Sequence, residues 1–181
     1  MKLEEKELSR KRVLDESSMT INASEVLLPD GKVRTRFWRE HDGSVGVLAL
    51  DEEGRIAIVR QYRFAIQRVT YEIPAGHKEK EETELEGAKR ELFEETGSTA
   101  DRFDFLGYMT PSGSASTEKT ALYLATGIHK STARDLDDDE FLSLEWIGVK
   151  DFNELVKSGE VWDPKTLCAL YYAVAEGHLS I

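Results

Sequence analysis

The stretch GHKEKEETELEGAKRELFEETGS, residues 76–98, determines how the rest of this sequence is interpreted. Apolar residues recur in it at helical spacing, at Leu85, Ala88 and Leu92. Thr83 with Glu86 forms a capping box before this pattern, and Gly97 suits the C-terminal cap after it. The stretch therefore predicts a helix that begins after Thr83 and ends before Gly97.

The glutamates of this helix differ in whether a cation lies one turn away. Glu86 and Glu94 each lie four residues from Arg90, which predicts ordinary ion pairs. Glu91 and Glu95 lie about one turn apart on one face, and neither has Lys or Arg three or four residues away. A hard divalent cation, Mg²⁺ or Mn²⁺, would compensate such a pair, because these cations prefer oxygen ligands. The alternative is a repulsion tolerated on the surface.

The spacing of the polar residues resembles a family signature. Gly76, Glu82 and the run RELFEETG at residues 90–97 resemble the signature of the Nudix hydrolases, which cleave nucleoside diphosphates linked to another moiety. The sequence differs from it at Ser98, where the pattern has an aliphatic residue. The resemblance implies an α/β fold, in which a loop-helix-loop is set in an α/β/α sandwich with a mixed sheet.

The resemblance also implies roles for individual positions. Glu91 and Glu95 match the main metal ligands, and Glu94 matches a frequent additional ligand. The positions that orient the ligand helix or turn the backbone sharply are matched by Arg90, Glu82, Gly76 and Gly97. For Glu91 and Glu95 this agrees with the charge argument.

Two stretches before the helix indicate the branch of the family. RQYRFAI at 60–66 and TYEIPAGHKEKEE at 70–82 resemble the ADP-ribose and nucleotide-sugar pyrophosphatases. The resemblance implies that Arg63 binds phosphate, which suits a guanidinium, and that the Ala75 carbonyl is a metal ligand. Arg60 and Glu72 in the same stretches are further candidates for substrate binding. The alternative for Arg63 is a strand-end residue in water.

Two further stretches, both after the helix, contain candidate site residues. In MTPSGSASTEKTALYLA, residues 109–125, Pro111 resembles the marker proline of the branch but is slightly closer to the signature, which leaves related nucleotide sugars open. Glu118 in this loop is a candidate contact to phosphate or metal, or else a solvated turn residue. In DLDDDEFLSLEWI, residues 135–147, the resemblance implies that Glu140 activates water, with Asp139 as the alternative.

The remaining pattern predicts the organisation of the chain. β-Rich runs alternate with turns from Val13 to Arg63, which predicts an antiparallel meander. Later strands are expected within residues 103–109, 120–128 and 141–147, followed by a short helix opened by Asp151 and a last helix after Pro164. We expect residues 1–12 to form a charged arm and residues 13–181 one domain, whose β-rich segment 13–43 can be exchanged in a dimer.

Composition narrows the function classes. The 181 residues are 40% hydrophobic and contain one cysteine, which excludes a wholly disordered chain and an intramolecular disulfide scaffold. A formal net charge of -11 disfavours nucleic acid and anionic membranes as partners. No apolar stretch is long enough to span a bilayer, and the start MKLEEKELSRKR lacks the apolar segment of a signal peptide, so we expect a cytoplasmic protein.

The resemblance implies a reaction and an assembly. The reaction is Mg²⁺-dependent hydrolysis of the diphosphate bond of ADP-ribose or a related nucleoside diphosphate sugar, which gives a nucleoside monophosphate and a sugar phosphate. The assembly is a homodimer that exchanges N-terminal strands. The alternatives are a Nudix hydrolase for dinucleoside polyphosphates and a non-catalytic module that binds a nucleotide sugar.

Overall fold

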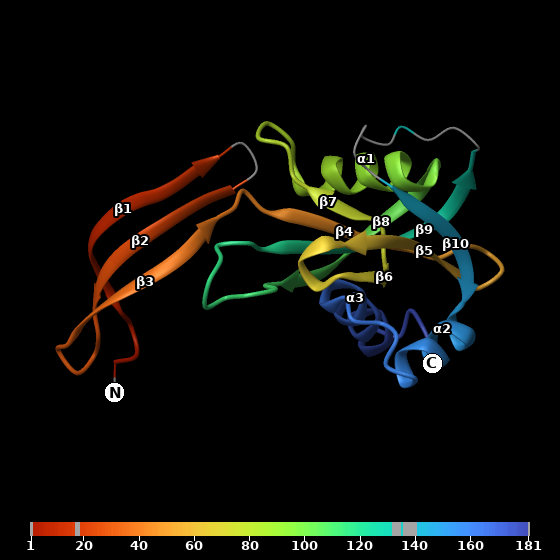
Figure 1. Ribbon diagram of the computed structural model, residues 1–181. Helices are drawn as coiled ribbons and strands as arrows, with labels where there is room; N and C mark the ends of the chain where they lie inside the picture. Colours follow the sequence, from red (N-terminus) through yellow and green to blue (C-terminus); the bar gives the residue numbers. More distant parts are fainter. Residues whose placement is uncertain (1, 17–18, 132–134, 136–140, 181) are drawn as a thin grey trace. The chain divides into compact units, whose positions relative to one another are not determined.

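The structure is a computed structural model that describes residues 2–16, 19–131, 135 and 141–180. The chain divides into two compact units (Figure 1). The first comprises Met1–Gly43 with Thr110–Lys119, and the second comprises Ser44–Met109 with Thr120–Ile181. The β-rich segment 13–43 of the sequence therefore lies in the first unit, and the predicted metal helix lies in the second.

The first unit contains a three-stranded antiparallel sheet in the order β1-β2-β3. Its strands are β1 Lys6–Glu16, β2 Met19–Leu27 and β3 Val33–Glu40. The predicted meander is confirmed here. Strand β1 begins within the charged segment 1–12, and all of its residues are exposed, so this segment forms an edge strand. Regular structure starts earlier than the expected position near Val13.

The second unit contains two sheets, of which one is mixed. The antiparallel sheet has the order β10-β5-β6, with β5 Arg55–Arg63, β6 Arg68–Glu72 and β10 Leu142–Gly148. The other has the order β7-β4-β9-β8, with β4 Ser44–Ala49, β7 Ala75–His77, β8 Ser98–Met109 and β9 Thr120–Lys130. In it β4 and β9 run parallel, while β4 with β7 and β8 with β9 are antiparallel.

The predicted meander does not continue to Arg63. Strands β4 and β5 follow one another across the turn at residues 51–54, but each belongs to a different sheet. Strand β4 is buried on both faces and pairs with β7 and β9, and β5 meets the end of this segment only through the isolated antiparallel bridge Leu50–Ile56. The near-continuous apolar run of β4 is typical of such a central strand. The meander interpretation considered only neighbours in sequence.

The helices begin and end at recognisable signals. They are α1 Glu84–Thr96, α2 Val149–Lys157 and α3 Pro164–Ala175, with a short 3₁₀ helix, η1, at Phe64–Ile66. The predicted capping box of Thr83 and Glu86 is confirmed, and Gly97 ends α1 with a φ of 67°. Helix α2 begins two residues before Asp151, at a cap formed by Gly148, so the predicted start was too late.

Helices cover both faces of the sheet layer in the second unit (Figure 1). Val45 and Val47 of β4 pack with Leu92 of α1 in one apolar cluster. Leu48, from the other face of β4, packs with Phe152 of α2 and residues of α3 in a second cluster. Side chains that alternate along one strand thus pack into two separate apolar cores. The predicted α/β/α sandwich is confirmed.

No helix in the described part of the chain has the length and apolar character needed to cross a bilayer.

Candidate active site

Arg90 on α1 is the centre of a charged cluster. Its Nε and Nη2 donate to the two carboxylate oxygens of Glu82 at 3.0 and 3.1 Å. Its Nη1 donates to Glu91 at 2.8 Å and to Glu94 at 2.7 Å, and its Nη2 also donates to the His77 carbonyl at 2.9 Å. These hydrogen bonds, that with Glu82 foremost, raise the pKa of Arg90. One guanidinium therefore fixes three carboxylates and the loop before the helix.

This cluster corrects one part of the charge argument. Glu91 was predicted to lack a cation within reach, but Arg90, its neighbour in sequence, donates to it. Helical arithmetic considers the positions three and four residues away, and it misses a long side chain that bends along its own helix. Among the described residues, this one guanidinium is shared by three carboxylates, those of Glu82, Glu91 and Glu94.

The predicted metal ligands lie on the buried side of α1. Glu91 is 7% exposed and Glu95 is 3% exposed. The Ala75 backbone N–H donates to a carboxylate oxygen of Glu95 at 3.1 Å, so the peptide that carries the predicted carbonyl ligand lies beside the helix. Burial makes carboxylate repulsion stronger than on the surface, which favours a compensating cation.

Gly76 lies where no side chain fits. A Cβ at this position would lie 2.1 Å from an Oε of Glu91, so the loop approaches the helix closely only because the residue is glycine. Buried carboxylates beside a glycine loop are oxygen donors of the kind that hard divalent cations prefer. Among the described residues, no three His, Cys, Asp or Glu side chains form a preformed metal cluster.

Arg63 is the last residue of β5. Its Nε and Nη2 donate to the two oxygens of Glu72 at 2.7 and 2.6 Å, and its side chain is 44% exposed. The hydrogen bonds to Glu72 raise the pKa of Arg63, and the charges of Asp163 and Glu95 add to this effect. Arg63 is therefore near enough to Glu95 for their charges to interact.

Glu72, predicted to bind substrate, is 3% exposed and surrounded by cations. Burial alone would raise its pKa, but hydrogen bonds from Arg63 and the charge of Lys165 lower the pKa to about 2. Lys165 was not found from the sequence, because it lies 93 residues from Glu72 and belongs to no motif. The signal available was its place in the first turn of a helix after Pro164.

The structure does not bring Arg60 into this group. Arg60 pairs with Glu145 of β10 at 3.3 Å, and its guanidinium lies 5.2 Å from the ring centre of Tyr71. Residues three apart on a strand point to opposite faces, so Arg60 and Arg63 of β5 cannot converge on one ligand from the same face. The substrate-binding role of Arg60 stays a prediction without a geometric basis.

Glu118 belongs to the first unit. Its Oε1 lies 3.9 Å from Nε2 of His41, and the Thr117 hydroxyl accepts from the His41 backbone N–H at 2.9 Å. Trp38, in the same unit, donates to the Ser24 hydroxyl at 3.0 Å and lies under the Arg10 guanidinium. Both side chains are thus held by neighbours within the first unit.

Glu140 and Asp139, the two candidates for the water-activating base, lie outside the described residues. Their roles stay predictions.

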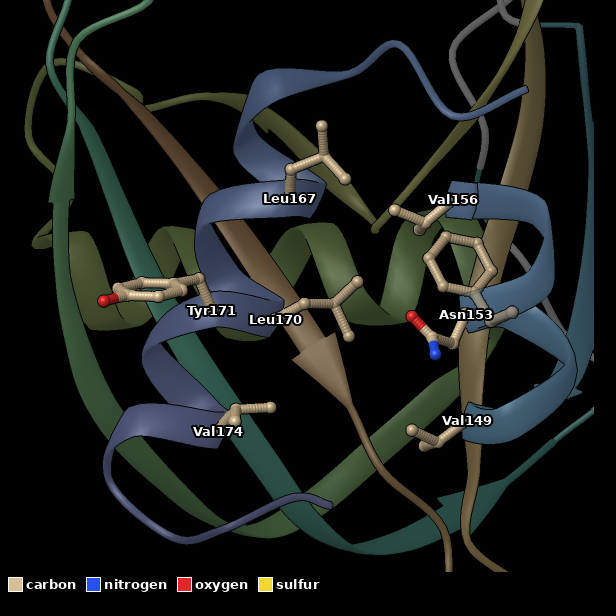
Figure 2. Close-up of a pocket in the computed structure, with 8 residues that line it drawn as sticks. Val149, Asn153, Val156, Leu167, Leu170, Tyr171 and Val174 are labelled. Atoms are coloured by element: carbon tan, nitrogen blue, oxygen red, sulfur yellow. The ribbon is translucent and has the colours of Figure 1, made fainter. Parts of the chain in front are cut away.

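An apolar pocket of about 140 Å³ separates α2 from α3 (Figure 2). It is lined by Val149, Phe152, Asn153, Val156, Leu167, Leu170, Tyr171 and Val174. No lining residue is charged, so this pocket offers nothing to a diphosphate. The charged groups of the loop-helix-loop and of β5–β6 are the better candidate site.

Comparisons with known proteins place the chain among relatives of known family and fold. The model of the NUDIX domain matches residues 40–170. A Bacillus subtilis ADP-ribose pyrophosphatase is 36% identical over 94% of this chain and 92% of its own length. A Bacillus methanolicus methanol dehydrogenase activator is 33% identical over 93% of this chain and 92% of its own length. A solved structure of an ADP compounds hydrolase superposes with a TM-score of 0.85 at 17% identity, covering 99% of this chain and 100% of the other, which supports the fold.

Proposed function

Because this chain belongs to the Nudix hydrolase family, we propose that it hydrolyses the diphosphate bond of ADP-ribose or a related nucleoside diphosphate sugar. The products are a nucleoside monophosphate and a sugar phosphate. Relatives named ADP-ribose pyrophosphatase, from Bacillus subtilis and from Mycobacterium tuberculosis, the latter 31% identical over 78% of this chain, support this substrate class. The observation that carries the proposal is the pair of buried carboxylates, Glu91 and Glu95, on a helix that the Gly76 loop approaches closely, in a chain that matches the NUDIX domain.

The cofactor in this proposal is Mg²⁺, with Mn²⁺ as a substitute. Glu91, Glu95 and the Ala75 carbonyl are the proposed ligands, and Glu94 is an additional one. When bound, the cation neutralises charge on the diphosphate, which otherwise repels a protein of net charge -11. Arg90 holds the carboxylates of Glu91 and Glu94 in place before the cation arrives.

The chain's own residues divide the remaining work. Arg63 binds the diphosphate through its charge and its planar donors. Glu140 takes a proton from the attacking water, and Asp139 or Glu118 is the substitute candidate for this role. In this scheme water attacks one phosphorus directly, the bond from that phosphorus to the bridging oxygen breaks, and the other monophosphate ester leaves with that oxygen, so no covalent intermediate forms on the protein.

The proposed assembly is a cytoplasmic homodimer. Apolar side chains are exposed on the first unit's sheet, among them Leu8 at 50%, Val13 at 46% and Phe37 at 64%. Exposed apolar side chains favour contact with another protein surface, and β1 offers an open edge as well. Light scattering of the purified chain tests the assembly, for which a mass of about 41 kDa, twice the 20.5 kDa of one chain, is expected.

A substrate panel tests the proposed activity. ADP-ribose, other nucleoside diphosphate sugars and dinucleoside polyphosphates are incubated with Mg²⁺, and released monophosphates are separated by chromatography. We expect AMP and ribose 5-phosphate from ADP-ribose, and no release by the Glu95→Gln protein. Cleavage of dinucleoside polyphosphates without cleavage of any nucleotide sugar would overturn the proposed substrate class. Binding without cleavage would favour the non-catalytic module.

A further inference from the structure

A charged network connects the first turn of α3 with the end of β5. The Lys165 ammonium donates to Glu72 of β6, and it donates to Asp163 at 2.9 Å. Glu72 in turn accepts from Nε and Nη2 of Arg63. Two carboxylates and two cations therefore alternate along a chain that ends at Arg63.

Three members of this network are shielded from water. The side chains of Glu72, Asp163 and Lys165 are 3%, 9% and 15% exposed, whereas that of Arg63 is 44% exposed. Charges in such surroundings interact strongly, and each carboxylate must be matched by a cation. Only the Arg63 end of the network faces solvent.

Glu72 has no capacity left for a ligand. One of its oxygens accepts from Arg63 Nε and from the Thr70 hydroxyl, and the other accepts from Arg63 Nη2 and from Lys165. A carboxylate offers about four acceptor positions, and all of these are used. Glu72 therefore acts on Arg63 rather than on a substrate.

Arg63 keeps donors available after it has bound Glu72. A guanidinium has five N–H groups in a planar fork, and the edge formed by Nε and Nη2 is occupied. The edge formed by the two Nη atoms remains, and this edge matches the spacing of two phosphate oxygens. Glu72 thus determines which edge of Arg63 faces the site.

The Lys165 ammonium affects whether Glu72 is the carboxylate that holds Arg63. The charge of Asp163 acts on Arg63 as well, so both carboxylates attract the same guanidinium. Lys165 lies between Asp163 and Glu72 and compensates one negative charge. Without it, two buried carboxylates would share Arg63, and the guanidinium would be drawn away from the phosphate position.

We propose that Lys165 is a positioning residue, which compensates Asp163 so that Glu72 holds Arg63 by one edge and leaves the other edge for the diphosphate. This inference rests on the proposed function. Asp163 has a second task that keeps it in place, since it caps α3 through the Thr166 backbone N–H at 2.9 Å. The Thr166 hydroxyl in turn accepts from the Ile73 N–H at 2.8 Å, which fixes α3 against the residue that follows Glu72.

A double-mutant cycle tests the proposal. Kinetics are measured with ADP-ribose and Mg²⁺ for wild type, Lys165→Met, Arg63→Ala and the combination of both. Lys165→Met should lower kcat/KM by about 30-fold, mainly by raising KM. This is the size expected if Arg63 loses one charge-assisted hydrogen bond to the diphosphate. In the Arg63→Ala background the same change should alter kcat/KM by less than about twofold, because Lys165 acts through Arg63. A loss of equal size in both backgrounds would overturn the proposal.

A charge-balanced variant gives a second, independent measurement. Asp163→Asn combined with Lys165→Met removes one charge of each sign, and asparagine can still cap α3. We expect kcat/KM to return to within about fivefold of wild type. A merely structural role for Lys165 predicts no such recovery. If circular dichroism shows that Lys165→Met alone does not fold, the double variant Asp163→Asn/Lys165→Met is used for the test. A loss of kcat/KM in the double variant as large as that in Arg63→Ala would contradict the proposal.

Two controls separate the possible failures. Lys157→Met removes an exposed lysine that pairs with Glu154 on α2, and it should leave kcat/KM unchanged. An active wild type with additive cycles would reject the inference and leave the proposed function intact. A wild type that releases no monophosphate from any nucleotide sugar would reject the proposed function, and the inference with it.

Discussion

The two arginine networks of the second unit are built from the same residue types but differ in charge balance. In the described part of the chain, the Arg90 guanidinium of α1 contacts three carboxylates, those of Glu82, Glu91 and Glu94. At the end of β5, by contrast, Arg63 and Lys165 face two carboxylates. The first network thus joins three carboxylates to one cation, and the second joins two to two.

This difference in balance indicates which ligand each network suits. Several carboxylates close together at α1 lower the free energy of a bound cation, because each of them attracts its charge. A balanced network at Arg63 repels neither sign strongly, and it presents donors from a fixed direction to an anion. A metal diphosphate complex needs both kinds of surface side by side.

The largest expected effect follows from removing one carboxylate of α1. Glu95→Gln should lower kcat by about 10⁴-fold or more, since a metal ion supplies several kcal/mol of stabilisation to the transition state. The fold should be as stable as wild type in the absence of metal, because a repulsion is removed. Kinetics at saturating Mg²⁺ and melting in chelator check both parts. Exposed Glu154 of α2 provides the control, Glu154→Gln.

The next effect concerns the general base that activates water, which belongs to neither of the two networks. Glu140→Gln should lower kcat by about 10²- to 10⁴-fold with little change in Mg²⁺ affinity. Asp139→Asn should change kcat far less, because only one carboxylate can lie in line with the water. A Glu140→Gln enzyme within threefold of wild type at saturating substrate would move the role to Asp139 or Glu118.

A change at the glycine loop perturbs the α1 network without removing a charge. Gly76→Ala places a methyl group where the Glu91 carboxylate lies, 2.1 Å from its oxygen. Glu91 must then move, and we expect kcat/KM to fall by about 100-fold and the apparent Mg²⁺ requirement to rise. Gly31→Ala, at a position of positive φ with open space around it, is the control for backbone strain alone. Unchanged Mg²⁺ dependence in Gly76→Ala would argue against Glu91 as a ligand.

The same contrast shows what the sequence could predict. The signals that reside within one helix, the capping box, Gly97 and the face of Glu91 and Glu95, correctly described α1. Such signals depend on residues a few positions apart, so local geometry suffices. The Arg63 network depends on Lys165, 93 residues from Glu72, and only the packing of α3 against β6 brings these charges together.

Strand pairing, too, was predictable only between strands that are neighbours in sequence. The β2–β3 hairpin of the first unit connects neighbours in sequence, and it was predicted, whereas most of β1 lies in the segment that was expected to be a charged arm. Strand β4 pairs in parallel with β9 across more than seventy residues, and no turn signal marks such a contact. The sequence pattern therefore indicated buried strands but left their partners undetermined.

An effect of similar size to that of Gly76→Ala distinguishes charge from geometry at Arg63. Arg63→Ala should lower kcat/KM by about 100-fold, and Arg63→Lys should recover little of this, because an ammonium cannot bind Glu72 by one edge and phosphate by the other. Kinetics with ADP-ribose across a range of Mg²⁺ concentrations measure both variants. A Lys variant with wild-type kinetics would show that this position needs only a positive charge.

The smallest effect is on the pH dependence of stability, and it involves the balanced network alone. The Glu72 pKa lies at about 2, below its ordinary value of 4.5. A lowered carboxylate pKa contributes stability that is fully present above pH 4.5 and is lost as the pH falls through the folded-state pKa. Integrated over this shift, the contribution is up to about 3 kcal/mol.

Glu72→Gln should therefore destabilise the protein at pH 7 and progressively less between pH 5 and 2. Urea unfolding at several pH values measures this difference against Glu145→Gln, which breaks an exposed pair with Arg60 and should cost about 1 kcal/mol or less at pH 7. A pH-independent difference between wild type and Glu72→Gln would mean that Glu72 is held by packing rather than by the charges of Arg63 and Lys165.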